Sequence, residues 1–197
     1  MKKFTLLLSA ILLVAAASTA SAQVRRQTEN SPSVVLKANV LSPFVLTASG
    51  FVEFALAPHM SAQFGAFTTG ASYKDVEFSG YGFTPEVRYY LSDTKEAPRG
   101  VYVAGYGRIL NYKLTVEDKE EGKTYEATYA PIGAGLAAGN QWIFNSGISL
   151  DLFMGLGVNG GSLKVNSGSE EDFDLGFLNL VGSGVRFRPG ITVGYSF

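Results

Sequence analysis

The chain has 197 residues, of which 46% are hydrophobic and only 17% are charged, and this balance excludes an intrinsically disordered protein. Its 16 Lys and Arg residues nearly cancel 17 Asp and Glu residues, so no overall basic field favours nucleic acid as a partner. The absence of Cys excludes disulfides, thiol nucleophiles and Cys-ligated zinc, and the single His, His59, leaves few options for metal or acid–base chemistry. One domain of a membrane or secreted type remains.

The first residues have the three-part layout of a secretory signal peptide. Lys2 and Lys3 give a basic start, an apolar stretch follows, and Ala20-Ser21-Ala22 supplies small residues for cleavage. The alternative, an N-terminal membrane helix, needs about 20 apolar residues, and this stretch is shorter. No later segment has 18 uninterrupted apolar residues, so only a closed barrel could still span a membrane. We expect a signal peptide over 1–22, a flexible leader over 23–32 and one domain over 33–197.

Alternation of apolar residues with polar or small residues predicts strands through most of the mature chain. The clearest case is the C-terminal end, where apolar residues occupy every second position from Val185 to Phe197. Successive side chains of a strand point to opposite faces, so this pattern predicts one apolar and one polar face. In chain order, we expect eight strands near 33–41, 50–57, 61–70, 82–92, 100–114, 124–138, 146–158 and 185–197.

The apolar faces could meet lipid, or a second sheet as in a soluble sandwich or lipocalin-like barrel. Glycine-rich opposite faces, aromatic residues near strand ends and strands of about nine to thirteen residues favour the membrane barrel. The predicted fold is therefore all-β, an eight-stranded antiparallel up-and-down transmembrane β-barrel preceded by a signal peptide. Short periplasmic turns are expected at 57–60, 93–99 and 139–145, and longer outer loops at 71–81, 115–123 and 159–184.

Several positions depart from simple alternation. The strand over 100–114 is apolar on both parities, so its inward face stays open. A phase change near Pro131 predicts a bulge, and Pro85 and Pro189 predict local irregularity because each removes a backbone donor. The segment 41–47 is too apolar for an ordinary exposed loop.

Several segments carry a resemblance to a known class of proteins. They are the signal peptide, Pro85-Glu86-Val87-Arg88-Tyr89-Tyr90-Leu91, the Gly-rich stretch ending at Phe144, and the terminal Gly190-Ile191-Thr192-Val193-Gly194-Tyr195-Ser196-Phe197. Together they resemble small outer-membrane β-barrel proteins of Gram-negative bacteria, most closely the uncharacterised eight-stranded members of the OmpA and OmpX type. The resemblance implies an outer-membrane location. It also implies that Tyr195 and Phe197 act as a signal to the outer-membrane assembly machinery.

The inward parity carries charged residues of both signs. An eight-stranded barrel has an interior just wide enough for side chains, where charges must pair or meet water. We therefore predict a salt-bridged plug, and the alternative is that these residues line a narrow ion path. The expected lumen charge network consists of Lys37, Glu53, Glu86, Arg88, Arg108, Asp151, Arg186 and Arg188.

Two acidic clusters fall in the expected outer loops, one at 117–121 and one at 170–174. Neither has the ligand spacing of a calcium-binding EF-hand loop, so solvated loop charge is the favoured interpretation. Gly155-x-Gly157-x-x-Gly160 matches a dinucleotide-binding fingerprint in letters only, because no helical pattern follows it.

Catalysis receives little support from the sequence. Some outer-membrane barrels hydrolyse or transfer lipid acyl groups, and this chemistry usually needs a Ser nucleophile with a His base. His59 is the only candidate base, it lies in an expected periplasmic turn, and the chain has no G-x-S-x-G elbow. We expect a monomeric, non-enzymatic barrel without a cofactor, which contacts outer-membrane lipid and serves envelope structure or surface interaction through its outer loops. The alternatives are a narrow pore or transporter for small solutes and, less favoured, a lipid-modifying enzyme.

Overall fold

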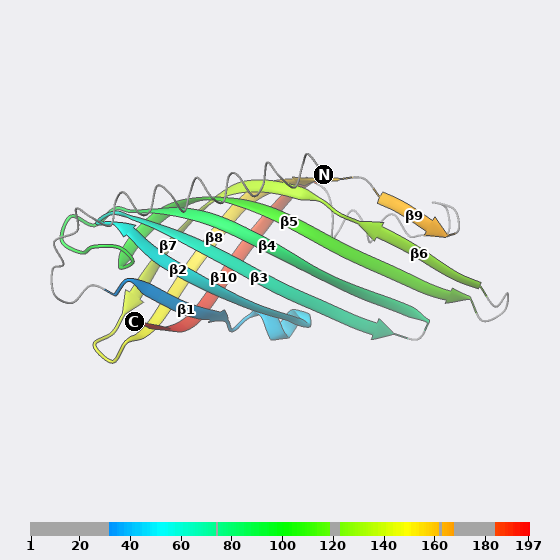
Figure 1. Ribbon diagram of the computed structural model, residues 1–197, viewed down its shortest axis with the longest axis horizontal. Helices are drawn as coiled ribbons and strands as arrows, with labels where there is room; N and C mark the ends of the chain where they lie inside the picture. The colour runs from blue at the N-terminus through cyan, green and yellow to red at the C-terminus, as the bar shows by residue number, and fades with distance from the viewer. Residues whose placement is uncertain (1–31, 74, 119–122, 162, 168–183) are drawn as a thin grey trace.

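A computed structural model describes residues 32–73, 75–118, 123–161, 163–167 and 184–197. The expected signal peptide and all but the last residue of the expected leader lie outside these ranges. Ten strand segments form one antiparallel sheet (Figure 1). They are β1 (Val34–Asn39), β2 (Thr47–Ala57), β3 (Met60–Tyr73), β4 (Val76–Tyr90), β5 (Gly100–Asp118), β6 (Lys123–Tyr129), β7 (Ile132–Ile143), β8 (Ile148–Gly160), β9 (Leu163–Ser167) and β10 (Gly184–Ser196).

The sheet closes on itself because β1 pairs with β10 and β4 pairs with β5. Two of the ten segments, β6 and β9, share strand positions with β7 and β8. β7 and β6 pair with successive parts of β5, and β9 pairs with β6 as β8 pairs with β7. The barrel therefore has eight strand positions, and neighbours in the chain are neighbours in the sheet. This arrangement confirms the predicted all-β fold, an eight-stranded antiparallel up-and-down barrel.

The two ends of the barrel differ. The end drawn at the left of Figure 1, called here the turn end, carries the connections at 58–59, 91–99 and 144–147 and the C-terminus. The opposite end, called here the loop end, is where β3 and β5 end and where β4 and β6 begin. The strands β3, β4 and β5 extend further toward the loop end than the sequence predicted. At the turn end, β7 continues to Ile143, so the predicted turn at 139–145 was wrong in its start.

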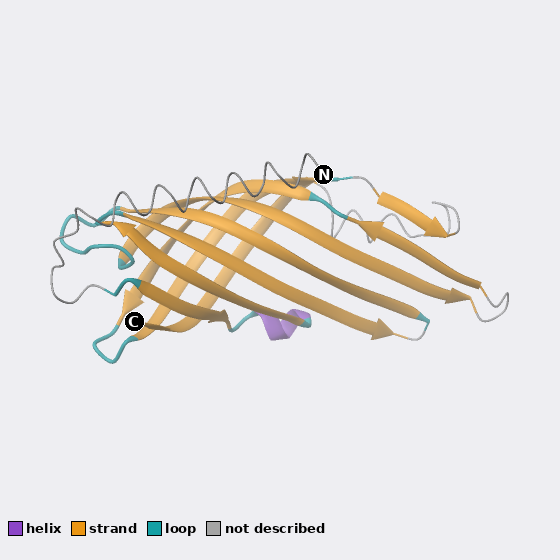
Figure 2. Ribbon diagram, viewed as in Figure 1, coloured by secondary structure: helices purple, strands orange, loops and turns teal. Residues whose placement is uncertain are grey.

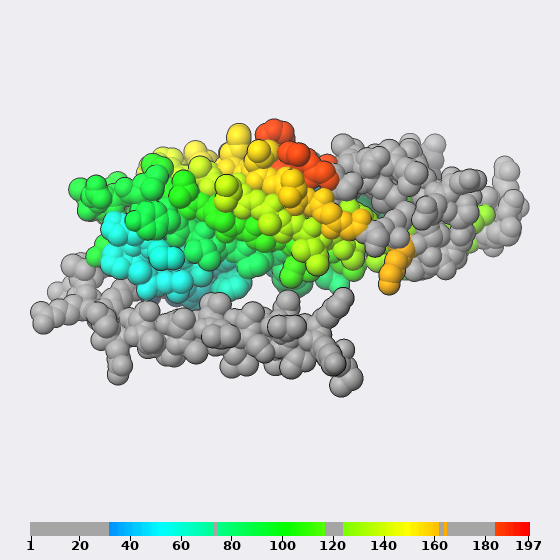
Figure 3. Space-filling model, turned by 90° about the horizontal axis from the view of Figure 1, so that it is seen from above, coloured from blue at the N-terminus to red at the C-terminus, as the bar shows by residue number. Residues whose placement is uncertain are grey.

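The wall has its apolar side chains outside and its polar side chains inside. Along β8, buried and exposed residues alternate, and Met154 on the outer face is 65% exposed whereas Asp151 on the inner face is fully buried. On β5, Tyr102 and Tyr106 point inward while Val101 and Val103 are exposed, which decides the face that the sequence left open. Figure 3 shows side chains of the strands from β5 (green) to β8 (yellow) forming one continuous surface on one side of the barrel.

The prolines interrupt the wall in different ways. At Pro131 the sixth strand position divides into β6 and β7, in agreement with the predicted phase change. At Pro85 the pairing of β4 with β5 lapses, although the register is the same on both sides of the gap. At Pro189 the register with β8 is unbroken, so no irregularity occurs on that side.

The apolar segment 41–47 forms a 3-10 helix, η1 (Ser42–Val45), followed by Leu46 with φ of 54° (Figure 2). It lies where the wall is incomplete. β1 is short, and its register ends at Asn39 opposite Thr192 of β10 and at Ala38 opposite Gly50 of β2. Beyond this level, β2 pairs with β3 and β10 pairs with β8, without β1 between them.

Candidate functional site

Charged side chains from five strands meet inside the lumen, in the half nearer the turn end. Alternation along each strand points them inward, and the closure of the sheet brings strands distant in the sequence around one space. The side chains of this lumen network are Lys37 of β1, Glu53 of β2, Glu86 and Arg88 of β4, Asp151 of β8 and Arg188 of β10.

Glu53 and Asp151 share two cations. The Lys37 Nζ lies 2.6 Å from Glu53 Oε2 and 3.3 Å from Asp151 Oδ2. The Arg88 Nη1 lies 2.9 Å from Asp151 Oδ2 and 3.4 Å from Glu53 Oε2. All four side chains are fully buried, so each charge depends on its partners rather than on water.

Glu86 joins the two arginines of the network. The Arg88 Nε donates to Glu86 Oε1 at 2.7 Å, and the Arg188 Nη1 donates to Glu86 Oε2 at 2.7 Å. The network thus contains three cations and three carboxylates. Its formal charge is balanced within the lumen, as burial of ions requires.

Neutral donors complete the coordination of the carboxylates. Tyr90 Oη donates to Glu53 Oε1 at 2.6 Å, Ser61 Oγ donates to the same oxygen at 2.5 Å, and Tyr102 Oη donates to Asp151 Oδ1 at 2.9 Å. The network predicted from the sequence did not include these three residues. Ser61 and Tyr90 lie on the inward parity of their strands, so the same pattern could have found them.

Gln141 connects the lumen network to the turn end. Its Oε1 accepts from Lys37 Nζ at 2.7 Å, and its Nε2 donates to the backbone oxygen of Pro98 at 2.7 Å. Pro98 and Ala97 are buried, and the Ala97 N–H donates to the Pro58 oxygen at 2.7 Å. The connection 91–99 therefore folds over the lumen at this end. Gln141 was missed because it was assigned to a turn.

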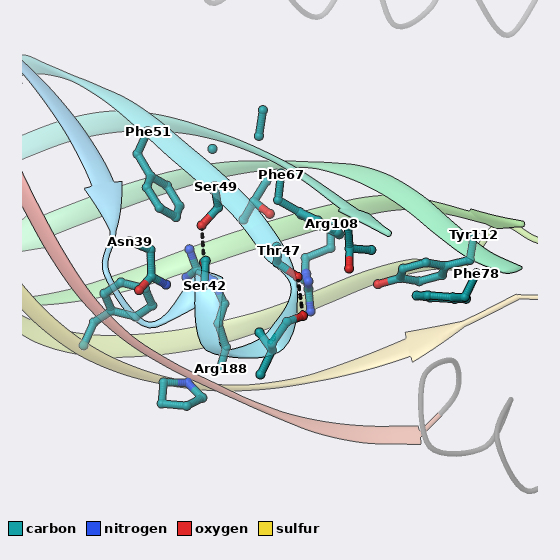
Figure 4. A pocket seen from close by; sticks show the side chains of 17 residues that line it. Asn39, Ser42, Thr47, Ser49, Phe51, Phe67, Phe78, Arg108, Tyr112 and Arg188 are labelled. Atoms are coloured by element: carbon teal, nitrogen blue, oxygen red, sulfur yellow. Dashed lines mark hydrogen bonds between the residues drawn. The ribbon is translucent and has the colours of Figure 1, made fainter. Parts of the chain in front are cut away.

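The ion pairs that define the lumen network do not include Arg108 or Arg186. Arg108 lies nearer the loop end, where its guanidinium carbon is 5.9 Å from the centre of the Phe67 ring. It lines a cavity that also contacts Arg188, whose guanidinium stacks on Phe153 at 4.6 Å (Figure 4). Arg186 is partly exposed on the same face of β10 as Arg188. Of the eight predicted residues, the structure brings six together.

The remaining candidate residues lie apart from the lumen network. His59 is in the turn between β2 and β3, and its Nδ1 lies 3.2 Å from the backbone oxygen of Tyr90. Tyr195 and Phe197 are on the outer surface, and their rings meet edge to face at 5.1 Å. In the described ranges, no group of three or more His, Asp or Glu side chains could hold a metal ion, and no helix is long and apolar enough to cross a membrane. Both acidic clusters fall where side chains are not described.

A closed eight-stranded β-barrel with an apolar outer wall and a charged network in its lumen defines the class of this protein. The chain belongs to the family described as "Protein of unknown function (DUF3575)", whose model matches residues 8–165. No curated protein sequence is significantly similar to it.

Among solved structures, the chain is similar to Ail, the attachment invasion locus protein of Yersinia pestis, with 12% identity, a TM-score of 0.48 and coverage of 84% of this chain and 97% of that one. It is also similar to a major outer membrane protein from Thermus thermophilus, with 16% identity, a TM-score of 0.48 and coverage of 84% and 98%. The N-terminal β-barrel domain of Pseudomonas aeruginosa OprF gives 14% identity, a TM-score of 0.42 and coverage of 85% and 98%.

Proposed function

We propose that this protein is a non-enzymatic outer-membrane β-barrel with a plugged lumen, which serves the cell envelope through its membrane-embedded wall and its outer loops. The observation that carries the proposal is the inverted distribution of polarity. Large apolar side chains such as Leu136 and Phe187 are 73% and 75% exposed, whereas Arg88, Glu53 and Asp151 are fully buried. A soluble barrel would place such apolar surface inside, and only a lipid environment makes the observed arrangement favourable.

The location is tested by cell fractionation and by gel mobility. We expect the protein in the outer-membrane fraction, and we expect the unheated protein in detergent to migrate differently from the boiled protein because a closed barrel stays compact. Recovery in the soluble periplasmic fraction, with one mobility for both samples, would overturn the proposal.

A plugged lumen is supported by the lumen network and by the connection 91–99. Six charges and their neutral partners occupy the half of the interior nearer the turn end, and the interior of an eight-stranded barrel is just wide enough for side chains to fill. We therefore expect no steady current when the purified protein is inserted into a planar bilayer. A steady current that changes when Arg88 or Glu86 is replaced would support the narrow pore instead.

The non-enzymatic character is supported by the surroundings of His59. This residue lies at the turn end and contacts a backbone carbonyl at 3.2 Å, whereas a catalytic base needs a nucleophile within hydrogen-bonding distance. Purified protein incubated with phospholipid should release no fatty acid. Release that is abolished by His59→Ala would establish the lipid-modifying alternative.

A further inference from the structure

The loop-end half of the lumen contains a cavity of about 350 Å³ that the charged network does not fill. Its volume lies within the range of small-molecule sites, roughly 300–1,000 Å³. Figure 4 shows Arg108 and Arg188 approaching this space from β5 and β10, with Ser42 of η1 and Ser49 of β2 beside it.

The charged side chains that line the cavity are both cationic, and one of them, Arg188, also pairs through its Nη1 with Glu86. The charged lining residues are Arg108 and Arg188, and no carboxylate lines the cavity among the described residues. The Arg108 Nε and the Arg188 Nη2 are buried without an acceptor in the described part of the chain. A buried donor without an acceptor is costly, so an anionic group placed between the two guanidinium groups would be stabilised.

Much of the remaining lining is apolar. Phe51, Phe67, Phe78 and Phe153 contribute aromatic rings, and Val45 of η1 contributes an aliphatic side chain. A small inorganic anion would leave these surfaces without a partner. A ligand with both an acidic group and a hydrocarbon part would cover the rings and supply the acceptor.

The cavity also reaches the incomplete part of the wall. Its lining includes Ser42 and Val45 of η1, Thr47 of β2 and Pro189 of β10, the elements that flank the level at which β1 has ended. The last hydrogen bond on the β1 side of β10 runs from the Val40 N–H to the Ile191 oxygen. Pro189 lies two residues closer to the loop end, where this edge of β10 has no paired strand. Because Pro has no N–H, it leaves no backbone donor without a partner there.

The outer surface of η1 continues the apolar wall. Phe44 is 85% exposed, and Val45 and Leu46 are 68% and 64% exposed. Val45 therefore contacts the cavity on one side and the exterior on the other. At this level η1, rather than a paired strand, separates the interior of the barrel from hydrocarbon chains in the membrane.

We propose that the loop-end cavity binds a single-chain amphiphile with an anionic head group, a carboxylate or a phosphate, which enters from the lipid between β2 and β10 beside η1. The head group lies between Arg108 and Arg188, and the chain lies against the phenylalanine rings. The entry route rests on the proposed membrane location, whereas the binding site rests on the cavity alone.

Calorimetric titration of the purified protein in a neutral detergent tests the site. The probes are decanoate, decyl phosphate, decanol and inorganic phosphate. We expect one bound molecule of decanoate or decyl phosphate, and binding of decanol and inorganic phosphate weaker by about tenfold or more, the effect of one lost charged hydrogen bond. Equal binding of decanol would overturn the role of the arginines, and equal binding of inorganic phosphate would overturn the amphiphile.

Substitutions at two cations of β5, Arg108 and Lys113, provide a matched comparison. Arg108→Gln should weaken decanoate binding by about tenfold or more, and Arg108→Lys should weaken it less because the charge is kept. Lys113 lies on the same strand, but it pairs with Glu126 outside the cavity. Lys113→Gln should therefore bind decanoate as the unaltered protein does. Equal affinities for Arg108→Gln and Lys113→Gln would overturn the site. Gel mobility before and after boiling shows separately whether each variant forms the barrel.

The entry route is tested by fixing η1. The hydroxyl oxygens of Ser42 and Ser49 lie 2.5 Å apart, and the chain has no Cys, so Ser42→Cys with Ser49→Cys can form a single disulfide between η1 and β2. The oxidised protein, placed in lipid discs, should bind and release decanoate several-fold more slowly, and reduction should restore both rates. Equal rates in the oxidised and reduced proteins would overturn entry beside η1 and leave the binding site to be judged by the titration.

Discussion

Arg88 and Asp151 are 63 residues apart in the sequence and meet inside the barrel, with the Arg88 Nη1 2.9 Å from Asp151 Oδ2. The strands that carry them, β4 and β8, do not pair with each other, so this contact joins two parts of the wall through the lumen. Arg88 also contacts Glu86 and Glu53. It is the cation of the lumen network that contacts all three carboxylates.

Arg88→Met should therefore destabilise the barrel strongly. Removing one partner of a buried ion pair leaves uncompensated charge, which costs roughly 3–5 kcal/mol of unfolding free energy. Urea unfolding from lipid vesicles, followed by fluorescence of Trp142, the single Trp, measures the change. Lys113→Met is the control, because its pair with Glu126 is exposed and contributes about 1 kcal/mol or less. Equal losses in the two variants would contradict the assigned importance of Arg88.

The tyrosine hydroxyls of the lumen network make a second, smaller contribution. Tyr89 and Tyr90 are neighbours on β4, but Tyr90 is fully buried with Oη 2.6 Å from Glu53, whereas Tyr89 is half exposed on the outer wall. Tyr90→Phe should lose about 1.5–3 kcal/mol, the usual contribution of a hydrogen bond to a charged group. Tyr89→Phe should change stability little. The same urea experiment compares them, and a smaller loss for Tyr90→Phe than for Tyr89→Phe would contradict the structure.

Alternation in the sequence predicts which face of a strand a residue occupies, but it does not predict the height of that residue in the barrel. Arg108 and Arg188 were both assigned to the interior on this basis. Of these two, only Arg188 reaches Glu86. Glu86 lies opposite Tyr106 of β5, so Arg108 lies two residues closer to the loop end. These heights depend on the stagger of the paired strands, and no local pattern records it.

Two other features could not be predicted from the sequence, because they also depend on how the strands pair. Gln141 follows a run of Gly and Ala that weakens the strand pattern, so its inward position depends on pairing with Asp151 of β8. The apolar segment 41–47 breaks the alternation of β1, but only the missing neighbour between β2 and β10 explains why apolar side chains are exposed there. By contrast, the C-terminal strand was predicted almost to the residue because 13 alternating positions fix its face.

Glycines of β7 make room for the tyrosines of β5. Tyr102 lies directly opposite Gly139, and a Cβ added at Gly139 would lie 2.6 Å from the Tyr102 hydroxyl oxygen and 2.6 Å from the Leu152 backbone oxygen. Gly139→Ala should therefore lower stability by about 1–3 kcal/mol, the usual cost of overpacking. Gly105→Ala is the control, since nothing lies within 4 Å of its added Cβ. Thermal loss of the folded gel band compares them, and equal midpoints would contradict the packing described for β5 and β7.

The backbone and the side chains of the last residues have different roles: the backbone closes the barrel, and the side chains are the expected signal to the assembly machinery. The backbone of Phe197 joins the two ends of the barrel, since its N–H donates to the Val34 oxygen at 2.9 Å and its oxygen accepts from Ser33 at 3.0 Å. Its side chain contributes little to this closure, being 66% exposed beside Tyr195 on the outer surface. Phe197→Ala and Tyr195→Ala should therefore refold in detergent as the unaltered protein does.

In cells, the same two variants should accumulate in the periplasm and reach the outer membrane several-fold less, if the aromatic side chains are the assembly signal that the resemblance implies. Val193→Ala, an outward residue of the same strand, is the control and should assemble normally. Fractionation with quantitative immunoblotting measures the partition. Normal assembly of Phe197→Ala and Tyr195→Ala would assign these side chains to lipid contact alone. A loss of detergent refolding would instead make them structural, because a signal read by the cell's machinery has no part in refolding of the purified chain.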